Sequence, residues 1–244
     1  MATLAGRVAL VTGAGRRVGR AIAVALGAQG MRVVVHYKES VSGARDTAQA
    51  IEEAGGIAAL LRADLSDVTA CQQLIDAVVL EHGELYALVN SAAMMTRTPV
   101  GEVTQAEWDA MYALNVRAPF FLTQRAAPAL KTARGSIVNI ADLAAFETWV
   151  GYIPHGMTKA AVVQMTRAFA HALAPEIRVN AVAPGVVLLP EEFDATSAEH
   201  MRRTTPLGRF GTPEDVAAAV VYLLGAEYVT GEVIRVDGGR HIRH

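Results

Sequence analysis

The sequence alternates short runs of apolar, largely β-branched residues with longer segments whose apolar residues recur at helical spacing. Such alternation is typical of a parallel sheet covered by helices, because each parallel strand needs a crossover before the next one. The predicted strands are Val8–Thr12, Arg32–His36, Ala58–Ala63, Ala87–Asn90, Ser136–Ala141, Arg178–Ala183 and Glu232–Val236. The predicted helices are roughly Gly19–Gln29, Val41–Ala54, Val68–His82, Gln105–Lys131, His155–Leu173 and Pro213–Leu224. Ser66 or Asp67 is the predicted N-cap of the third helix, Thr104 of the fourth, and Thr212, followed by Pro213, of the sixth. The pattern predicts an α/β fold with a Rossmann-like, doubly wound parallel sheet of about seven strands.

One domain over residues 1–244 accounts for this pattern. Of the 244 residues, 52% are hydrophobic and 19% are charged, which is enough apolar material for a large core. No Pro/Ser-rich linker or block of charge divides the chain. Residues 186–210 lack clear periodicity and contain Pro190 and Pro206. We therefore expect a substrate loop there, either mobile or built from a short helix pair.

Charge and residue counts exclude several classes of protein. The formal net charge is −2, from 22 basic and 24 acidic residues, and no run of Lys or Arg favours nucleic acid. The one cysteine, Cys71, excludes an internal disulfide, and the seven histidines show no metal-binding spacing. Apolar stretches such as Val216–Leu224 fall short of the ~20 residues that span a bilayer, and the first residues show no signal-peptide pattern. We expect a cytoplasmic protein with neither a metal nor a membrane partner.

A glycine-rich turn follows the first predicted strand. Residues 12–19 read Thr-Gly-Ala-Gly-Arg-Arg-Val-Gly and lead into a predicted helix. Glycines there let the backbone approach a pyrophosphate, and the helix N-terminus attracts its charge. The segment predicts a dinucleotide site in which Gly13 and Gly19 matter most, and a plain tight turn is the alternative.

The end of the second predicted strand favours NADP over NAD. An acidic residue at this position accepts from the ribose 2′-hydroxyl and repels a 2′-phosphate, but this strand ends in His36-Tyr37-Lys38. Arg16 and Lys38 are placed to meet a phosphate dianion, unless both are ordinary solvent-exposed cations. Asp64 is either an acceptor for the adenine amino group or an aspartate that stabilises its own turn.

Together these motifs resemble the classical short-chain dehydrogenase/reductases, and more closely their pteridine-reductase-like branch. The resemblance covers nearly the whole chain and rests on Thr12-Gly13 with Gly19, Asp64-Leu65, Val89-Asn90-Ser91-Ala92, Asn115, Ile140 to Lys159, Val179-Asn180, Pro184-Gly185 and Val236-Asp237-Gly238-Gly239. Arg17 at the usual second glycine, and His36-Tyr37, are similar to that branch in particular. The resemblance implies that NADP(H) is held by Gly13, Arg16, Arg17, Val18, His36, Tyr37, Lys38, Asp64, Leu65, Asn90, Ser91, Ala92, Lys159, Pro184 and Gly185.

The catalytic set of the family is matched except at one position. That set is an Asn, a Ser that is Asp in the pteridine-reductase branch, and a Tyr four residues before a Lys. Asn115, Asp142 and Lys159 match, but His155 stands at the tyrosine position. On a helix, His155 and Lys159 share one face. The positive charge of Lys159 beside His155 favours a neutral imidazole. Contact of His155 with Asp142 would instead favour an imidazolium that can donate a proton.

Three interpretations of this departure stay open. His155 is the general acid, Tyr152 is a substitute donor, or the site lacks an efficient donor. About 10 Å of helix separates Tyr152 from Lys159, so Tyr152 needs a bridging water or a non-helical start to the segment. The family role of Asn115 is a water-binding kink of the helix that takes part in a proton relay, and a simple interhelical hydrogen bond is the alternative.

The substrate side departs from a pterin-binding pattern. Where the branch has a stacking aromatic ring and a serine, this chain has Met95 and Ala93. Met94 and Met95 form either an adaptable pocket floor or core filling. Arg17 and Asp142 persist as candidate substrate contacts. The rest of a largely apolar pocket would be lined by Phe146, Trp149, Tyr152 and residues 186–189.

The sequence therefore predicts an NADPH-dependent oxidoreductase that reduces a carbonyl or imine carbon of a small, largely apolar or heterocyclic substrate. The alternatives are a non-catalytic NADP(H)-binding protein and a 3-oxoacyl thioester reductase. The resemblance also implies a homotetramer or homodimer, paired through the helices that carry Asn115 and His155 to Lys159.

Overall fold

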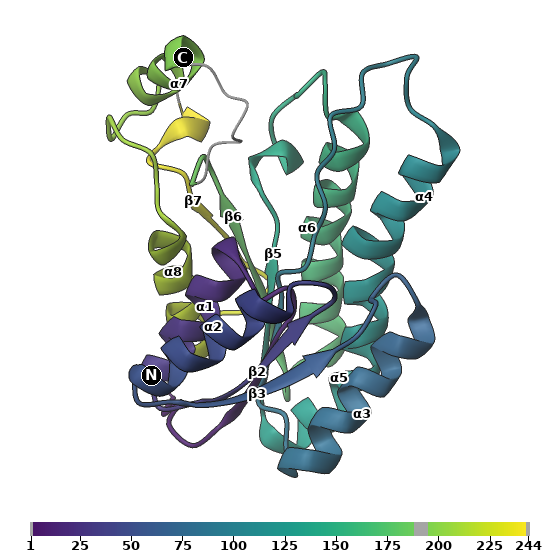
Figure 1. The fold of residues 1–244 in the computed structure, drawn as a ribbon, viewed down its shortest axis with the longest axis vertical. Coiled ribbons are helices and arrows are strands. Elements are labelled where there is room, and N and C mark those ends of the chain that lie inside the picture. The colour runs from purple at the N-terminus through teal and green to yellow at the C-terminus, as the bar shows by residue number, and fades with distance from the viewer. Residues whose placement is uncertain (1, 188–194, 243–244) are drawn as a thin grey trace.

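The computed structural model describes residues 2–187 and 195–242. Within these ranges seven strands form one sheet in the order β3-β2-β1-β4-β5-β6-β7, and every neighbouring pair is parallel (Figure 1). The strands are β1 (Val8–Val11), β2 (Arg32–Tyr37), β3 (Ile57–Arg62), β4 (Ala87–Asn90), β5 (Ser136–Ile140), β6 (Arg178–Pro184) and β7 (Val233–Val236). The strand order reverses between β1 and β4, which is where folds of this kind bind ligands.

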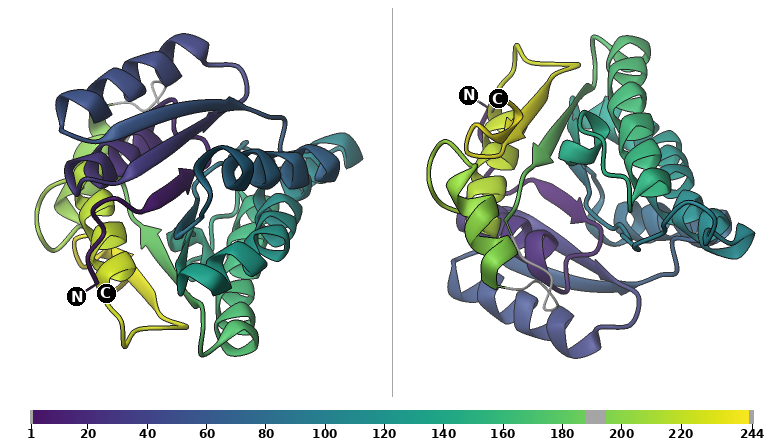
Figure 2. Two further views of the ribbon diagram at one scale, coloured as in Figure 1. Left: turned by 90° about the horizontal axis from the view of Figure 1, so that it is seen from below. Right: turned by 90° about the horizontal axis from the view of Figure 1, so that it is seen from above.

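Helices cover both faces of the sheet (Figure 2). One face carries α1 (Arg17–Ala28), α2 (Val41–Glu53) and α8 (Pro213–Gly225). The other carries α3 (Val68–His82), α5 (Ala118–Ala133) and α6 (Ile153–Leu173). The remaining elements are α4 (Gln105–Tyr112), the π-helix η1 (Ala113–Arg117), α7 (Ala195–Arg203) and the 3₁₀ turns η2 (Leu143–Ala145) and η3 (Arg240–Ile242). The predicted doubly wound α/β fold is confirmed.

The strands are apolar because both faces of the sheet are covered. All residues of β1 and β4 are buried, whereas the edge strands β3 and β7 are partly exposed. Two large apolar clusters result, one on each face of the sheet. Burial on both faces explains why the central strands read as continuous apolar runs rather than alternating ones.

Helix caps follow the predicted chemistry. Asp67 caps α3, and its carboxylate accepts from the backbone N–H groups of Thr69 and Ala70. Thr104 and Thr212 each begin a capping box, at α4 and α8. These local bonds fix where the crossover helices start.

Three predicted helix boundaries were wrong. The segment predicted as one helix, Gln105–Lys131, is α4, η1 and α5, because a π turn centred on Asn115 interrupts the regular hydrogen bonding. Helix α6 begins at Ile153 rather than His155, because Pro154 is accommodated in the first helical turn. Helix α1 begins at Arg17 rather than Gly19, with Arg17 in the left-handed region at φ 53°.

Part of the predicted substrate loop, residues 188–194, lies outside the described residues. The following segment of that loop forms α7. No helix in the two described ranges is long and apolar enough to cross a bilayer.

Candidate active site

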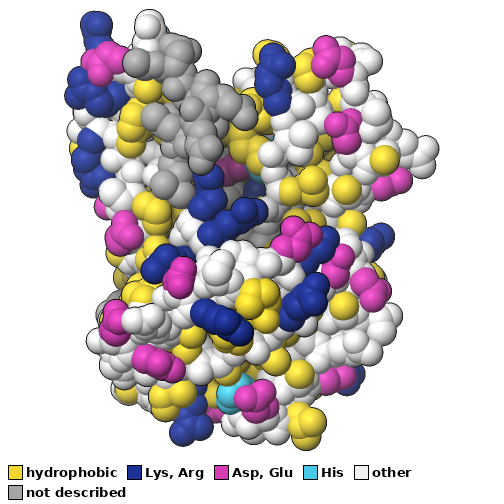
Figure 3. All heavy atoms as spheres, in the orientation of Figure 1, with side chains coloured by type: hydrophobic (Ala, Val, Ile, Leu, Met, Phe, Trp, Pro, Cys, Tyr) yellow, Lys and Arg dark blue, Asp and Glu magenta, His cyan; other side chains and the backbone are white. Residues whose placement is uncertain are grey.

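The site residues gather at the carboxyl ends of β1, β4, β5 and β6. Figure 3 shows the molecule hollowed at this end, with basic side chains along the hollow. Its two walls are the region of α7 and the loops that precede α4 and α6 (Figure 1). Parallel strands end at one edge of the sheet, so side chains distant in sequence meet there.

The glycine-rich turn fits tightly between β1 and α1. Gly13 has φ 65°, and a Cβ atom there would lie 2.9 Å from the Cα of Ala92. A Cβ on Gly19 would collide with the backbone carbonyl of Gly13. Both positions therefore need glycine. The side chain of Arg16, at the N-cap of α1, makes no capping bond to the backbone N–H groups of the first helical turn. The geometry brings the helix N-terminus and the turn together, as a pyrophosphate site requires.

His36 supports this turn from beneath and does not face the hollow. Its ring is 2% exposed; Nδ1 accepts from the N–H of Gly13 at 3.1 Å, and Nε2 lies 3.1 Å from the carbonyl oxygen of Ala63. Burial lowers the pKa of His36 to about 4, so the imidazole is neutral at physiological pH. Its predicted part in cofactor binding is thus limited to shaping the turn.

Thr12 joins the ends of β1 and β4, although sequence analysis noted it only as part of the motif. Its hydroxyl donates to the carbonyl of Val89 and accepts from the N–H groups of Ser91 and Ala92, at 3.3, 2.9 and 3.0 Å. The turn that carries Asn90 is therefore held against the glycine-rich turn.

The side-chain amide of Asn90 has a hydrogen-bond partner for its nitrogen but none for its oxygen among the described residues. Its Nδ2 donates to Asn139 Oδ1 at 2.8 Å, and Asn139 in turn donates to Thr166 on α6 at 2.9 Å. The buried Oδ1 of Asn90 has no partner among the described residues. A buried acceptor of this kind needs a donor from a bound molecule or a water.

A small polar cluster lies just past the ends of β2 and β3. Lys38 Nζ lies 3.0 Å from Asp64 Oδ2, and Asp64 Oδ1 accepts from the N–H and hydroxyl of Ser66. Those bonds from Ser66, together with Lys38, lower the pKa of Asp64 to about 2. Two further predicted cofactor residues, Val18 at the start of α1 and Tyr37 at the end of β2, are half-buried. Leu65 is 3% exposed and packs in the core rather than facing the hollow.

His155 and Asp142 form a close pair at the catalytic position. His155 Nε2 lies 2.6 Å from Asp142 Oδ2, and His155 Nδ1 lies 3.3 Å from the carbonyl oxygen of Met94. Both ring nitrogens thus lie within hydrogen-bond distance of an oxygen atom: Nδ1–H can donate to the Met94 carbonyl, and one proton can lie between Nε2 and the Asp142 carboxylate, carried by either partner. The His155 side chain is 3% exposed and that of Asp142 is 19% exposed. Asp142 is therefore the member of the pair that faces the hollow.

Lys159 lies behind this pair. It is buried, and its Nζ donates to the carbonyl of Ile140 at 2.9 Å. Burial lowers the pKa of Lys159, and the nearby Asp142 carboxylate partly offsets that effect. Burial acts to raise the pKa of Asp142, but the hydrogen bond from His155 and the charge of Lys159 outweigh it and hold the pKa below its ordinary value.

Asn115 organises the loop above the pair. Its Oδ1 accepts from the N–H of Met94, and its Nδ2 donates to the Met94 carbonyl and to the hydroxyl of Thr158, at 2.9, 2.9 and 3.1 Å. The side chain thus makes the interhelical bond that was the alternative to a water-binding role. The Met94 backbone N–H and carbonyl bond to Asn115, and the carbonyl also lies near His155. Sequence analysis could not predict these contacts, because every residue type carries the same backbone groups.

Comparisons with known proteins place this site in a family. Over residues 13–241 the sequence matches the family model described as Enoyl-(Acyl carrier protein) reductase. A short-chain dehydrogenase/reductase of solved structure, from Serratia marcescens, has a TM-score of 0.92 and 35% identity, covering 98% of this chain and 100% of its own. The chain belongs to the classical short-chain dehydrogenase/reductase family.

Two curated short-chain dehydrogenase/reductase relatives differ in what their names say they act on. One, from Streptomyces violaceoruber, is named as a ketoacyl reductase of the granaticin polyketide synthase and is 39% identical over 96% of both chains. The other, 3beta-hydroxysteroid dehydrogenase 1 of Eggerthella lenta, is 36% identical over 97% of this chain and 94% of its own. The chain is therefore an oxidoreductase by family, and its substrate is left open.

The aromatic residues predicted to line the pocket lie in the segment between η2 and α6 and contact their neighbours. The rings of Trp149 and Tyr152 lie 6.3 Å apart at near right angles, and Phe146 carries the guanidinium of Arg235 at 4.3 Å. Met95 is 48% exposed, which favours a pocket floor over core filling. Gly185 follows β6, where Pro184 is buried, and residues 188 and 189 of the predicted lining are not described.

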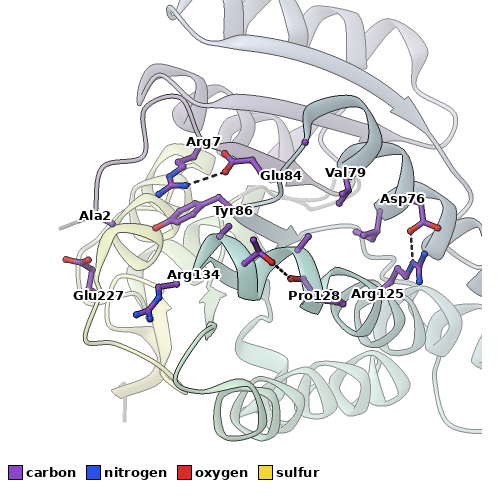
Figure 4. A pocket seen from close by; sticks show the side chains of 15 residues that line it. Ala2, Arg7, Asp76, Val79, Glu84, Tyr86, Arg125, Pro128, Arg134 and Glu227 are labelled. Atoms are coloured by element: carbon purple, nitrogen blue, oxygen red, sulfur yellow. Dashed lines mark hydrogen bonds and ion pairs between the residues drawn. The ribbon is translucent and has the colours of Figure 1, made fainter.

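A cavity of about 1030 Å³ lies elsewhere, beside the amino-terminal ends of the strands (Figure 4). Arg7, Glu84, Tyr86 and Arg134 line it. None of the predicted site residues of the family contributes to it. Within the described ranges no cluster of three or more His, Cys, Asp or Glu residues could hold a metal ion.

Proposed function

We propose that the protein is an NADPH-dependent reductase of a carbonyl or imine carbon, from the pteridine-reductase-like branch of its family. Its substrate is small and largely apolar or heterocyclic. The observation that carries the proposal is the 2.6 Å contact between His155 and Asp142, because it gives the missing tyrosine a replacement that can hold a transferable proton.

The residues present fit a nicotinamide dinucleotide. The turn at Gly13 and Gly19 leaves no room for a Cβ atom, and the Asn90 Oδ1 finds no partner in residues 2–187 and 195–242. Lys159 Nζ has two further N–H groups beyond its bond to Ile140. Gly13 and Arg17 would hold the pyrophosphate, Arg16 and Lys38 a 2′-phosphate, and Lys159 with the turn from Asn90 to Ala92 the nicotinamide ribose. When bound, this cofactor supplies the hydride.

The protein's own part is to deliver a proton and a complementary field. With His155 as imidazolium and Asp142 as carboxylate, the pair is neutral and holds one transferable proton. Asp142 faces the substrate, so the proton passes from His155 Nε2 through this carboxyl to the developing oxygen or nitrogen anion. The charge of Lys159, which acts on Asp142, would also stabilise negative charge that develops beside this carboxylate.

The structure also bears on Tyr152. It precedes α6 with φ −141° and ψ 33°, so the chain has the non-helical start that a substitute donor would need. Its ring packs near Trp149, which supports a substrate-contact role alongside Arg17 and Met95. We assign proton delivery to the Asp142–His155 pair because its members are in contact with each other.

NADPH oxidation by the Asp142→Asn variant tests this assignment. Asparagine keeps an oxygen for the N–H of Ala144 but cannot relay the proton. With dihydropterins, cyclic imines, diketones and 3-oxoacyl thioesters as substrates, we expect kcat to fall about 10²-fold or more while NADPH still binds. Unchanged kcat on every reactive substrate would contradict the proposed relay.

Two other functions are each favoured by one observation. A non-catalytic NADP(H)-binding protein is favoured by the engagement of both nitrogens of the buried His155. A 3-oxoacyl thioester reductase is favoured by the name of the Streptomyces relative. NADPH that binds tightly but is oxidised with no substrate would select the first, and activity confined to thioesters the second. A cytoplasmic location and a homotetramer or homodimer stay predictions.

A further inference from the structure

The candidate 2′-phosphate cation already has an anionic partner. Lys38 Nζ lies 3.0 Å from Asp64 Oδ2 and 3.9 Å from Glu39 Oε1. The Lys38 side chain is 53% exposed and that of Asp64 46% exposed. The pair is accessible to a ligand, and the lysine is free to exchange one anion for another.

Asp64 is held in place more firmly than Lys38. Its Oδ1 accepts from the N–H of Ser66 at 3.0 Å and from the Ser66 hydroxyl at 2.7 Å. The carbonyl of Ser66 in turn accepts from Arg117 of the π turn at 2.6 Å. The carboxylate therefore stays at the end of β3, whereas the flexible lysine stem can turn toward a phosphate.

We propose, on the basis of the function proposed above, that Asp64 tunes the choice between NADPH and NADH by competing with the ribose 2′-phosphate for Lys38. The fixed carboxylate occupies the lysine when no phosphate is present and repels the dianion when one arrives. NADH carries no 2′-phosphate, so its affinity does not depend on this exchange. Asp64 acts as a specificity-determining residue that weakens the preference set by Lys38 and Arg16.

Exposed ion pairs are weak, so the effect is modest and screened by salt. Asp64→Asn keeps an oxygen for the Ser66 bonds and removes only the charge. We expect NADPH to bind about three- to tenfold more tightly in this variant, with the affinity for NADH changed by less than about twofold. The gain falls at high ionic strength.

The test is a cycle of dissociation constants for NADPH and NADH, measured by calorimetry on the full chain. The variants are Asp64→Asn, Lys38→Gln and both together, with Asp46→Asn, an exposed carboxylate on α2, as a matched charge control. The expected result is a gain for NADPH that is clearly smaller in the Lys38→Gln background, where only the direct repulsion between Asp64 and the dianion is left, and that is absent in the control.

Each other outcome is decisive. Equal changes for NADPH and NADH would overturn the inference and leave Asp64 as an adenine contact alone. A gain of equal size in the Lys38→Gln background, or in the Asp46→Asn control, would reduce it to a general charge effect. If the unmodified chain binds neither dinucleotide, the proposed function itself fails, which is distinguishable from a failure of Asp64 to discriminate between them.

Discussion

Replacing Thr12 by valine should loosen the junction on which the cofactor site depends. Thr12 is 1% exposed, and its hydroxyl makes bonds to Val89, Ser91 and Ala92. Valine has nearly the same shape but no hydroxyl, so two backbone N–H groups lose their acceptor. At roughly 1–2 kcal/mol for each, the free energy of unfolding should fall by about 2–4 kcal/mol.

Thr12→Ser is the matched control, because it removes a methyl group and keeps the three hydrogen bonds. The assay is urea unfolding followed by tryptophan fluorescence, with all variants at one protein concentration since an oligomer's stability depends on it. The expected loss for Thr12→Val corresponds to roughly 4–16 °C in Tm. NADPH affinity should fall in Thr12→Val and stay nearly unchanged in Thr12→Ser. Equal stability of the two variants would refute the assigned role of the hydroxyl.

Three further perturbations test other parts of the structure. Burial lowers the pKa of His36 to about 4 from 6.5, so between these two pH values the unfolded chain binds a proton that the folded chain does not. The free energy of unfolding should therefore fall by about 3 kcal/mol as the pH drops from 6.5 to 4. His36→Asn should remove this part of the pH dependence of the denaturant midpoint. Gly19→Ala should abolish tight NADPH binding in calorimetry, because the new Cβ collides with the Gly13 carbonyl, and wild-type affinity would contradict this. Arg178 donates to three carbonyls at the end of α8, at 2.7, 2.7 and 2.9 Å, so Arg178→Met should lower thermal stability by about 2–4 kcal/mol without altering the kcat of the remaining folded protein.

The fold was predictable because its signals are periodic and local. The apolar runs located all seven strands within a few residues, and capping residues such as Asp67 marked helix starts. A kink at Asn115 was implied by the family resemblance alone, because the apolar pattern of residues 105–131 is continuous and the bonds from the Asn115 side chain reach Met94 and Thr158, which are distant in sequence.

The candidate site was predictable in residue identity but not in which groups face the hollow. The contact of Asp142 with His155 followed from the family pattern as a possibility, and the structure shows it. The exposures, 3% for His155 and 19% for Asp142, depend on packing that no spacing encodes. The cofactor contact of His36 stays a prediction, and the position of its ring beneath the glycine-rich turn depends on the carbonyl oxygen of Ala63, the residue after β3, which no local pattern indicates.

The most direct test of the central claim follows NADPH oxidation from about pH 5 to pH 9, with the unmodified protein beside its His155→Tyr variant and the same substrate panel. The Asp142–His155 assignment predicts activity in the unmodified protein that falls as pH rises through a single ionisation, since only the protonated pair can donate. In the His155→Tyr variant, this decrease of activity with rising pH should occur at a different pH or be absent. An inactive unmodified protein whose activity appears only with tyrosine would contradict the assignment, and would leave a cofactor-binding scaffold without a proton donor.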